Sequence, residues 1–137
     1  MGHFADHIAV AATRTFNLGD ALLKDISAAD FSRQPVASSG TIGTAGSGLI
    51  RTNHPAFVYG HLSLYPARMM EFMGLNPGSI APDQRYQDLF AHGKDCIHDP
   101  ERRTYPSMDE IVAKFRASHK AVLDALQIGR ASCRERV

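Results

Sequence analysis

Histidine and cysteine are the residue types in this sequence best suited to metal binding or proton transfer. The chain of 137 residues contains seven histidines and two cysteines. His61 stands out because it follows Gly60 in an apolar segment, where an imidazole needs a hydrogen-bonding partner or a metal ion. Two interpretations stay open. His61 is one ligand of a zinc or nickel site, which needs three or more ligands, or it is hydrogen-bonded in or beside the core, which is the commoner situation.

The other isolated histidines give weaker patterns. The i, i+4 spacing of His3 and His7 could place both imidazoles on one metal ion, but we interpret them as solvent-facing residues of a chain terminus. His54 precedes His61 by two helical turns, about 10 Å, which is too far to share a metal ion. We therefore expect His54 at the start of a helix. His119 flanks an apolar helical face, and we interpret it as a hydrogen-bonded boundary residue.

A local cluster contains His92, Cys96 and His98, with Asp95 and Asp99 beside them. Such a set could bind zinc or activate a thiolate. Its spacing matches no closed zinc module. A polar loop that contains one thiol is therefore the favoured interpretation.

Several function classes find no support in the sequence. The glycine-rich segment lacks the phosphate-binding patterns, and Ser63 and Ser118 have no nucleophile elbow around them. With 15 basic and 14 acidic residues the net charge is +1, which argues against nucleic acid or a membrane surface as the partner. No run of about 18 apolar residues and no secretion signal is present, so we expect a cytoplasmic protein.

Helical periodicity predicts the elements that must position these side chains. Apolar or small residues recur at steps of three and four over residues 4–26, 53–73 and 107–127. The predicted face of the first helix is formed by Phe4, Ile8, Ala11, Thr15, Leu18, Leu22 and Ile26. That of the last helix, which opens with the capping box Ser107 to Glu110, is formed by Ile111, Phe115, Val122 and Leu126. No segment alternates with period two, so the expected fold class is all-α.

The middle helix is apolar over most of its girth, so we expect it to be central in the fold. One stripe is formed by Val58, Leu62, Tyr65, Met69 and Phe72, and an adjoining stripe by Phe57, His61 and Leu64. Asn53 is the expected cap, Pro66 should bend the helix, and Gly74 should stop it. A glycine-rich loop over residues 38–50 precedes this helix, either above a functional site or as a surface excursion. A long connection with a short helix near residues 84–91 follows it.

The last ten residues, IGRASCRERV, break the apolar pattern and match the translation of a common sequencing-adapter read. We therefore treat residues 128–137 as a non-native tail and residues 1–127 as one domain. The domain has 12 basic and 13 acidic residues, a net charge of −1, and one cysteine, Cys96. A single thiol agrees with a reducing compartment.

The segment NHPAFVYGHLSLYPARMMEFMG, residues 53–74, resembles the second helix of the DinB-like (DinB/YfiT) superfamily. In that family a Gly-His-Leu sequence, here residues 60–62, directs a histidine into the bundle. The order of elements over residues 4–127 is similar too. The resemblance implies a DinB-like four-helix bundle with crossover connections, and it implies that His61 is a ligand of a divalent metal, zinc or nickel.

The family's other ligands are an H-x-x-x-H pair on the fourth helix, and no such pair follows His61. We therefore expect a truncated bundle that lacks most or all of that helix, does not bind the metal stably and is inactive. The full-length protein would be a thiol-dependent S-transferase or a metal-dependent hydrolase, with a small molecule or a low-molecular-weight thiol as substrate. The alternative is a metal-free helical bundle that acts as a binding or interaction module. An uncovered apolar face would favour self-association, for example as a homodimer.

Overall fold

The computed structural model describes residues 2–37 and 48–134, with side chains described for residues 6–37 and 48–127. The described part has five α-helices and no strand, so the all-α prediction is confirmed. The helices are α1 (Gly2–Leu22), α2 (Pro55–Leu62), α3 (Tyr65–Phe72), α4 (Gln84–Phe90) and α5 (Met108–Arg134). Short 3₁₀ turns follow α1 at Leu23–Asp25 and precede α4 at Gly78–Ile80. No helix of the described residues is long and apolar enough to cross a membrane.

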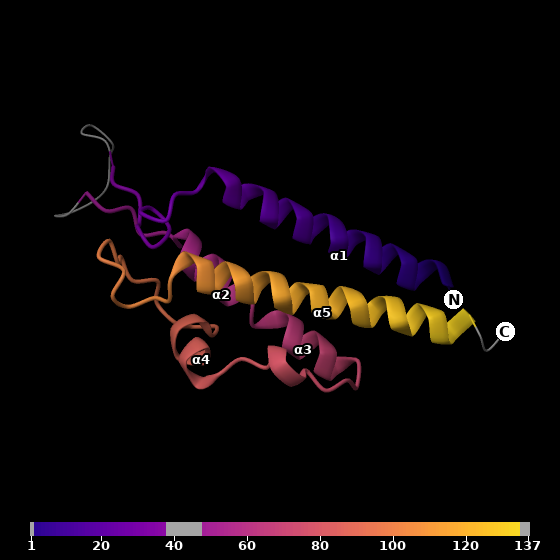
Figure 1. Cartoon of the computed structure of the whole chain (residues 1–137). Helices are drawn as coiled ribbons and strands as arrows, with labels where there is room; N and C mark the ends of the chain where they lie inside the picture. Colours follow the sequence, from indigo (N-terminus) through magenta and orange to yellow (C-terminus); the bar gives the residue numbers. More distant parts are fainter. Residues whose placement is uncertain (1, 38–47, 135–137) are drawn as a thin grey trace.

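The two long helices, α1 and α5, lie side by side and run in opposite directions (Figure 1). Helices α2 and α3 follow one another along a second side of α5, and the short α4 packs against α2. The core lies where these elements meet. Its largest fully buried residues include Tyr86 and Phe90 from α4 and Ile111 and Phe115 from α5.

The length of α1 is close to the prediction, but the predicted buried face is wrong. Ile8, Leu18 and Leu22 from that face are exposed. The helix instead buries Ala9, and Phe16 stacks on the ring of Phe115 with the ring centroids 5.5 Å apart. Both faces repeat at steps of three and four, so periodicity cannot rank them. The face that carries small residues is the one buried, because small side chains let α5 approach α1 closely.

The middle helix is divided, where the sequence predicted one bent helix. Helix α2 ends at Leu62, and Pro66 lies in the first turn of α3. Proline has no N–H to donate to the preceding turn, so the helix is interrupted and restarts rather than bends. Ser63 Oγ donates to the carbonyl of Gly60 at 2.7 Å within the break. Gly74, with φ of +73°, ends the segment as predicted.

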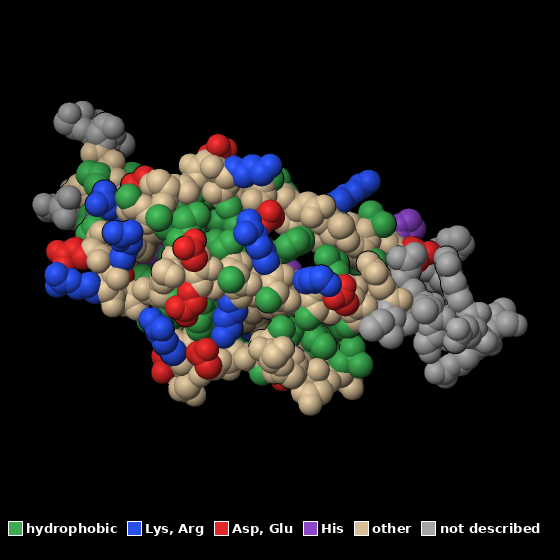
Figure 2. Space-filling view, in the orientation of Figure 1, with side chains coloured by type: hydrophobic (Ala, Val, Ile, Leu, Met, Phe, Trp, Pro, Cys, Tyr) green, Lys and Arg blue, Asp and Glu red, His purple; other side chains and the backbone are tan. Residues whose placement is uncertain are grey.

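Of the two stripes predicted for this segment, the one that begins at Val58 is exposed. Val58, Leu62, Tyr65 and Met69 are partly exposed, and Phe72 is 91% exposed. Figure 2 shows hydrophobic side chains on the surface at the lower right, where Figure 1 places α3. The buried residues of the segment are mostly small or belong to the adjoining stripe: Ala56, Phe57, Tyr59, Gly60, Ser63, Leu64, Pro66 and Ala67. Small side chains let α4 and α5 approach the backbone.

The last helix follows its predicted face. Ile111, Phe115 and Val122 are buried, and Ser107 Oγ accepts from the Glu110 amide at 3.2 Å. Helix α5 continues to Arg134, past residue 127, where we expected the tail to interrupt it. The short helix in the long connection is confirmed as α4.

The predicted glycine-rich loop lies mostly outside the described residues, at positions 38–47. The described segments before and after positions 38–47 are joined by a bridge between Val36 and Leu49. The amide of Ile50 also donates to the carbonyl of Pro35 at 2.8 Å.

Candidate functional site

Both ring nitrogens of His61 have a hydrogen-bonding partner. Nδ1 lies 2.6 Å from the carbonyl oxygen of Phe90, and Nε2 lies 2.9 Å from the hydroxyl of Tyr65. A carbonyl oxygen can only accept, so Nδ1 carries a proton and donates it. In the neutral imidazole, Nε2 then accepts from the Tyr65 hydroxyl. The ring of His61 also stacks on Phe57 at a centroid distance of 6.1 Å.

Gly60 explains why the carbonyl of Phe90 reaches His61. A Cβ at position 60 would lie 2.4 Å from the Phe90 ring, closer than real Cβ contacts. Only glycine therefore lets the end of α4 pack directly against α2. Gly60 and His61 thus act together. Gly60 leaves room for the Phe90 ring, and His61 donates a hydrogen bond to the Phe90 carbonyl.

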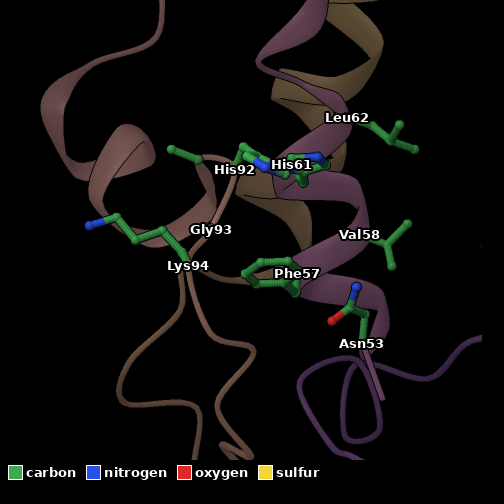
Figure 3. A pocket seen from close by; sticks show the side chains of 9 residues that line it. Asn53, Phe57, Val58, His61, Leu62, His92, Gly93 and Lys94 are labelled. Atoms are coloured by element: carbon green, nitrogen blue, oxygen red, sulfur yellow. The ribbon is translucent and has the colours of Figure 1, made fainter.

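His61 lies on the wall of a pocket of about 330 Å³ (Figure 3), which we call the His61 pocket. Helix α2 and the segment that follows α4 supply most of its wall. The lining residues are Asn53, Phe57, Val58, His61, Leu62, Ala91, His92, Gly93 and Lys94. Two segments far apart in the sequence thus form one site.

The lining combines an apolar wall with polar hydrogen-bonding groups. Phe57, Val58 and Leu62 supply apolar surface, while Asn53, His92 and Lys94 supply polar groups. The nine lining residues include a lysine but no aspartate or glutamate. Such a pocket suits a small ligand with an apolar body and an anionic group.

His54 begins α2, as predicted, but it also takes the capping role that we assigned to Asn53. The His54 ring is buried, and its Nδ1 accepts from the Phe57 amide at 3.2 Å. Its Nε2 then donates to the carbonyl of Ile97 at 2.9 Å. Asn53 is exposed and lines the His61 pocket instead. Burial lowers the pKa of His54, although the bond to Ile97 opposes this change.

The structure does not bring His92, Cys96 and His98 together as a metal-binding group. His92 lines the His61 pocket, Cys96 Sγ accepts from the His54 amide at 3.4 Å, and His98 Nδ1 accepts from the Gln34 amide at 3.0 Å. Burial raises the pKa of the Cys96 thiol, which disfavours the reactive thiolate.

Asp99 organises the turn that follows this cluster. Its carboxylate accepts from the backbone amides of Arg103, Thr104 and Tyr105 at 2.8–3.1 Å. Burial alone would raise the pKa of Asp99, but these bonds together outweigh it and lower that pKa.

Among the described residues, no group of three or more His, Cys, Asp or Glu side chains could hold a metal ion. His61 therefore lacks the partners that the DinB-like resemblance implies for a zinc or nickel site. The His3 side chain lies outside the described residues, and His7 is exposed. These residues do not by themselves fit a divalent metal.

His119 lies on α5 beside a second cavity. Its Nδ1 donates to the carbonyl of Phe115 at 2.9 Å, and its ring stacks on Phe16 at 5.5 Å. Burial lowers its pKa, against the opposing effect of the bond to Phe115. The cavity, about 260 Å³ in volume, lies between α1, α3 and α5 and is mainly apolar. The structure agrees with the boundary position that we predicted for His119.

Sequence reasoning missed three residues of the site. Tyr65 was assigned to an apolar stripe, although its i, i+4 spacing from His61 could have indicated the contact. Asn53 and Lys94 gave no signal, because they reach the pocket only through the packing of α4 on α2.

No protein-family model matches the sequence, and no curated protein or solved structure is significantly similar to it.

Proposed function

We propose that this protein is a helical binding module that works without a metal ion and holds a small organic anion in the His61 pocket. The observation that carries the proposal is that His61 is fixed through both ring nitrogens on the wall of a pocket that contains Lys94. An imidazole held by Phe90 and Tyr65 serves as a rigid surface for a ligand. A rigid, preformed wall lowers the entropic cost of binding.

The size and lining of the pocket define the ligand class. A volume of about 330 Å³ is at the lower end of known ligand sites, which favours a ligand of few atoms. The ring of Phe57 and the side chains of Val58 and Leu62 would contact its apolar part. The Lys94 side chain, which extends away from α2 in Figure 3, would turn toward the pocket to pair with its anionic group, and Asn53 and His92 would donate hydrogen bonds to it.

Benzoate is a suitable probe because it joins one small apolar ring to one carboxylate. Titration of benzoate into ¹⁵N-labelled protein should shift amide signals of α2 and of residues 91–94 in a saturable way. Lys94→Met keeps the aliphatic stem and removes the charge, so it should weaken binding about tenfold, the effect of losing one charged hydrogen bond. The matched control is Lys120→Met, because Lys120 is exposed on α5 and pairs with Asp124.

Benzyl alcohol, which lacks the charge, should bind more weakly than benzoate to the wild-type protein. Equal weakening by Lys94→Met and Lys120→Met would contradict a specific anion site. The absence of saturable shifts in α2 would contradict the pocket itself.

A divalent-metal function is the second candidate, and one contact favours it. Metal-binding histidines usually donate their other ring N–H to a carbonyl or carboxylate, as His61 does to Phe90. This candidate corresponds to the DinB-like resemblance, which implies that the full-length protein acts on a small molecule or a low-molecular-weight thiol as an S-transferase or hydrolase. The two candidates make different predictions for metal content. After equilibration of the full-length protein with zinc or nickel and desalting, His61→Ala should abolish a stoichiometric metal signal under the second candidate and leave the metal content unchanged under the first.

A further inference from the structure

His54 connects the start of α2 to the segment at residues 96–98. Its backbone amide donates to Cys96 Sγ, its Nε2 donates to the Ile97 carbonyl, and its Nδ1 accepts from the Phe57 amide. Cys96 and Ile97 are more than 40 positions away in the sequence. A single residue with 1% of its surface exposed therefore ties two distant segments together.

The same two segments form the wall of the His61 pocket. Asn53 directly precedes His54, and Lys94 lies two residues before Cys96. Displacement of residues 96–98 from α2 would therefore move Lys94 relative to Asn53. The contacts of His54 position the polar part of the pocket.

The bond between His54 Nδ1 and the Phe57 amide requires a neutral imidazole. Nδ1 can accept from the Phe57 amide only while it carries no proton. Protonation would place an N–H group against the Phe57 N–H and a positive charge at the N-terminus of α2, where the helix dipole disfavours it. The Ile97 carbonyl could still accept from Nε2, so the bond to the Phe57 amide is the one that fails.

The groups around His54 have opposing effects on its protonation. The charge of Asp99 favours protonation of His54, and His98 opposes it. Tyr105 packs edge-on against the imidazole at a centroid distance of 4.9 Å. Cys96 presents a thiol that its raised pKa keeps neutral. Burial is the largest influence, and it lowers the pKa of His54.

We propose that His54 is a pH-sensitive clasp whose protonation breaks its bond to the Phe57 amide, releases the first turn of α2 and so loosens the wall of the His61 pocket, which Phe57 and Val58 line. The opening is local, because the Ile97 amide also donates to the Tyr105 hydroxyl at 2.9 Å and does not depend on His54. The effect on ligand binding rests on the proposed function. The opening itself does not.

The expected pH dependence follows from linkage. An opened His54 titrates near its ordinary value of 6.5, whereas the closed form stays neutral to lower pH. The open population should therefore rise as the pH falls below about 6.5, by at most about tenfold per pH unit, until the closed form is itself protonated.

Amide hydrogen exchange, corrected for its intrinsic pH dependence, measures this population. The protection of the Phe57 amide should fall by up to about fivefold between about pH 6.5 and 5.5. The Glu110 amide is the internal control, because the Ser107 hydroxyl caps α5 in the same way and does not titrate in this range. Its protection should stay constant. Equal pH dependence at Phe57 and Glu110 would overturn the proposal.

His54→Asn separates capping from titration. Asparagine is a good helix cap and has no proton to gain, so the extra pH dependence at Phe57 should disappear. His119→Gln is the matched control, because His119 is half-buried and donates rather than accepts at Nδ1; this variant should retain the dependence. If His54→Asn does not fold, the ring ¹⁵N signals of wild-type His54 decide. An unprotonated Nδ1 that titrates below 6.5 together with the loss of Phe57 protection supports the clasp, and titration without that loss contradicts it.

Benzoate binding at pH 7.5 and 5.5 then tests the link to the pocket. Weaker binding at the lower pH in the wild-type protein, and not in His54→Asn, supports control of the site by the clasp. Equal binding by the wild-type protein at both pH values contradicts that control. If benzoate binds at neither pH while Phe57 protection falls as expected, the proposed function fails and the clasp stands.

Discussion

His61 donates from Nδ1 to the carbonyl oxygen of Phe90 across 2.6 Å, and this bond joins α2 to the end of α4. It exists because Gly60 leaves room for the ring of Phe90. The bond fixes both the position of the imidazole and the segment that carries His92 and Lys94. The geometry of the pocket therefore depends on the contact between α2 and α4.

Gly60→Ala should lower the free energy of unfolding by at least about 2 kcal/mol, because the new methyl group would overlap the buried Phe90 ring and the gain in helix propensity is only about 1 kcal/mol. Chemical denaturation measures the change. Gly19→Ala is the matched control, because a Cβ there would lie 3.2 Å from the end of the Phe115 ring. We expect it to stay within about 1 kcal/mol of the wild-type protein. Similar losses in both variants would contradict a specific requirement for glycine at position 60.

Tyr65→Phe should remove the partner of His61 Nε2 and leave the bond to Phe90 intact. Because the Tyr65 side chain is half exposed, the free energy of unfolding should fall by only about 0.5–1 kcal/mol. Ring ¹⁵N spectra should still show the proton of neutral His61 on Nδ1. A shift of that proton to Nε2 would show that Tyr65, rather than Phe90, sets the tautomer.

Asp99→Ala should lower the free energy of unfolding by about 3 kcal/mol, because three backbone amides lose a charged acceptor. Asp95→Ala, at an exposed position in the same connection, should change it by less than about 0.5 kcal/mol. The comparison needs only denaturation curves at pH 7. Equal effects would argue against the turn organised by Asp99.

The pH dependence of stability should show separate contributions from His54 and Asp99. The folded pKa of each lies below its ordinary value, so each contribution is fully present above the unfolded pKa and is lost as the pH falls through the folded pKa. The loss should begin near 6.5 for His54, together with His119, whose pKa burial also lowers, and near 3.8 for Asp99. Thermal unfolding between pH 8 and 3 measures both, and Asp99→Ala should remove only the lower step. A single loss confined to pH values below 4 would contradict the contribution of His54.

Cys96 should react slowly with iodoacetamide at pH 7.5, because burial raises its pKa. The measurement uses the Cys133→Ser variant, so that one thiol remains, and takes the urea-unfolded protein as the reference. We expect slower alkylation in the folded protein, because the raised pKa leaves a smaller population of the reactive thiolate. Equal rates would point to an activated or accessible thiol.

The sequence predicted which segments are helical far better than which faces they bury. The capping box at Ser107, the stop at Gly74 and the short α4 are recognisable because each depends on local backbone chemistry. The apolar face predicted for α1 and one of the two stripes predicted for α2 and α3 are largely exposed, because large apolar residues were counted as core. Close packing around Gly60 and Ala67 selected the faces with small residues instead.

The candidate site shows the same division. His61 could be singled out because an imidazole in an apolar helix needs partners. Its actual partner, the Phe90 carbonyl, is a backbone atom 29 positions away and carries no sequence signal. Lys94 joins the pocket because α4 docks on α2, and that docking depends on a long-range contact at Gly60.

The most direct test of the account is to locate bound benzoate by intermolecular nuclear Overhauser effects in the wild-type protein at pH 7.5. We expect contacts from the benzoate ring protons to the methyl groups of Val58 and to the ring of Phe57, which line the His61 pocket. Contacts to Phe16 and Met69, which line the apolar cavity between α1, α3 and α5, would place the ligand elsewhere and contradict the proposed site.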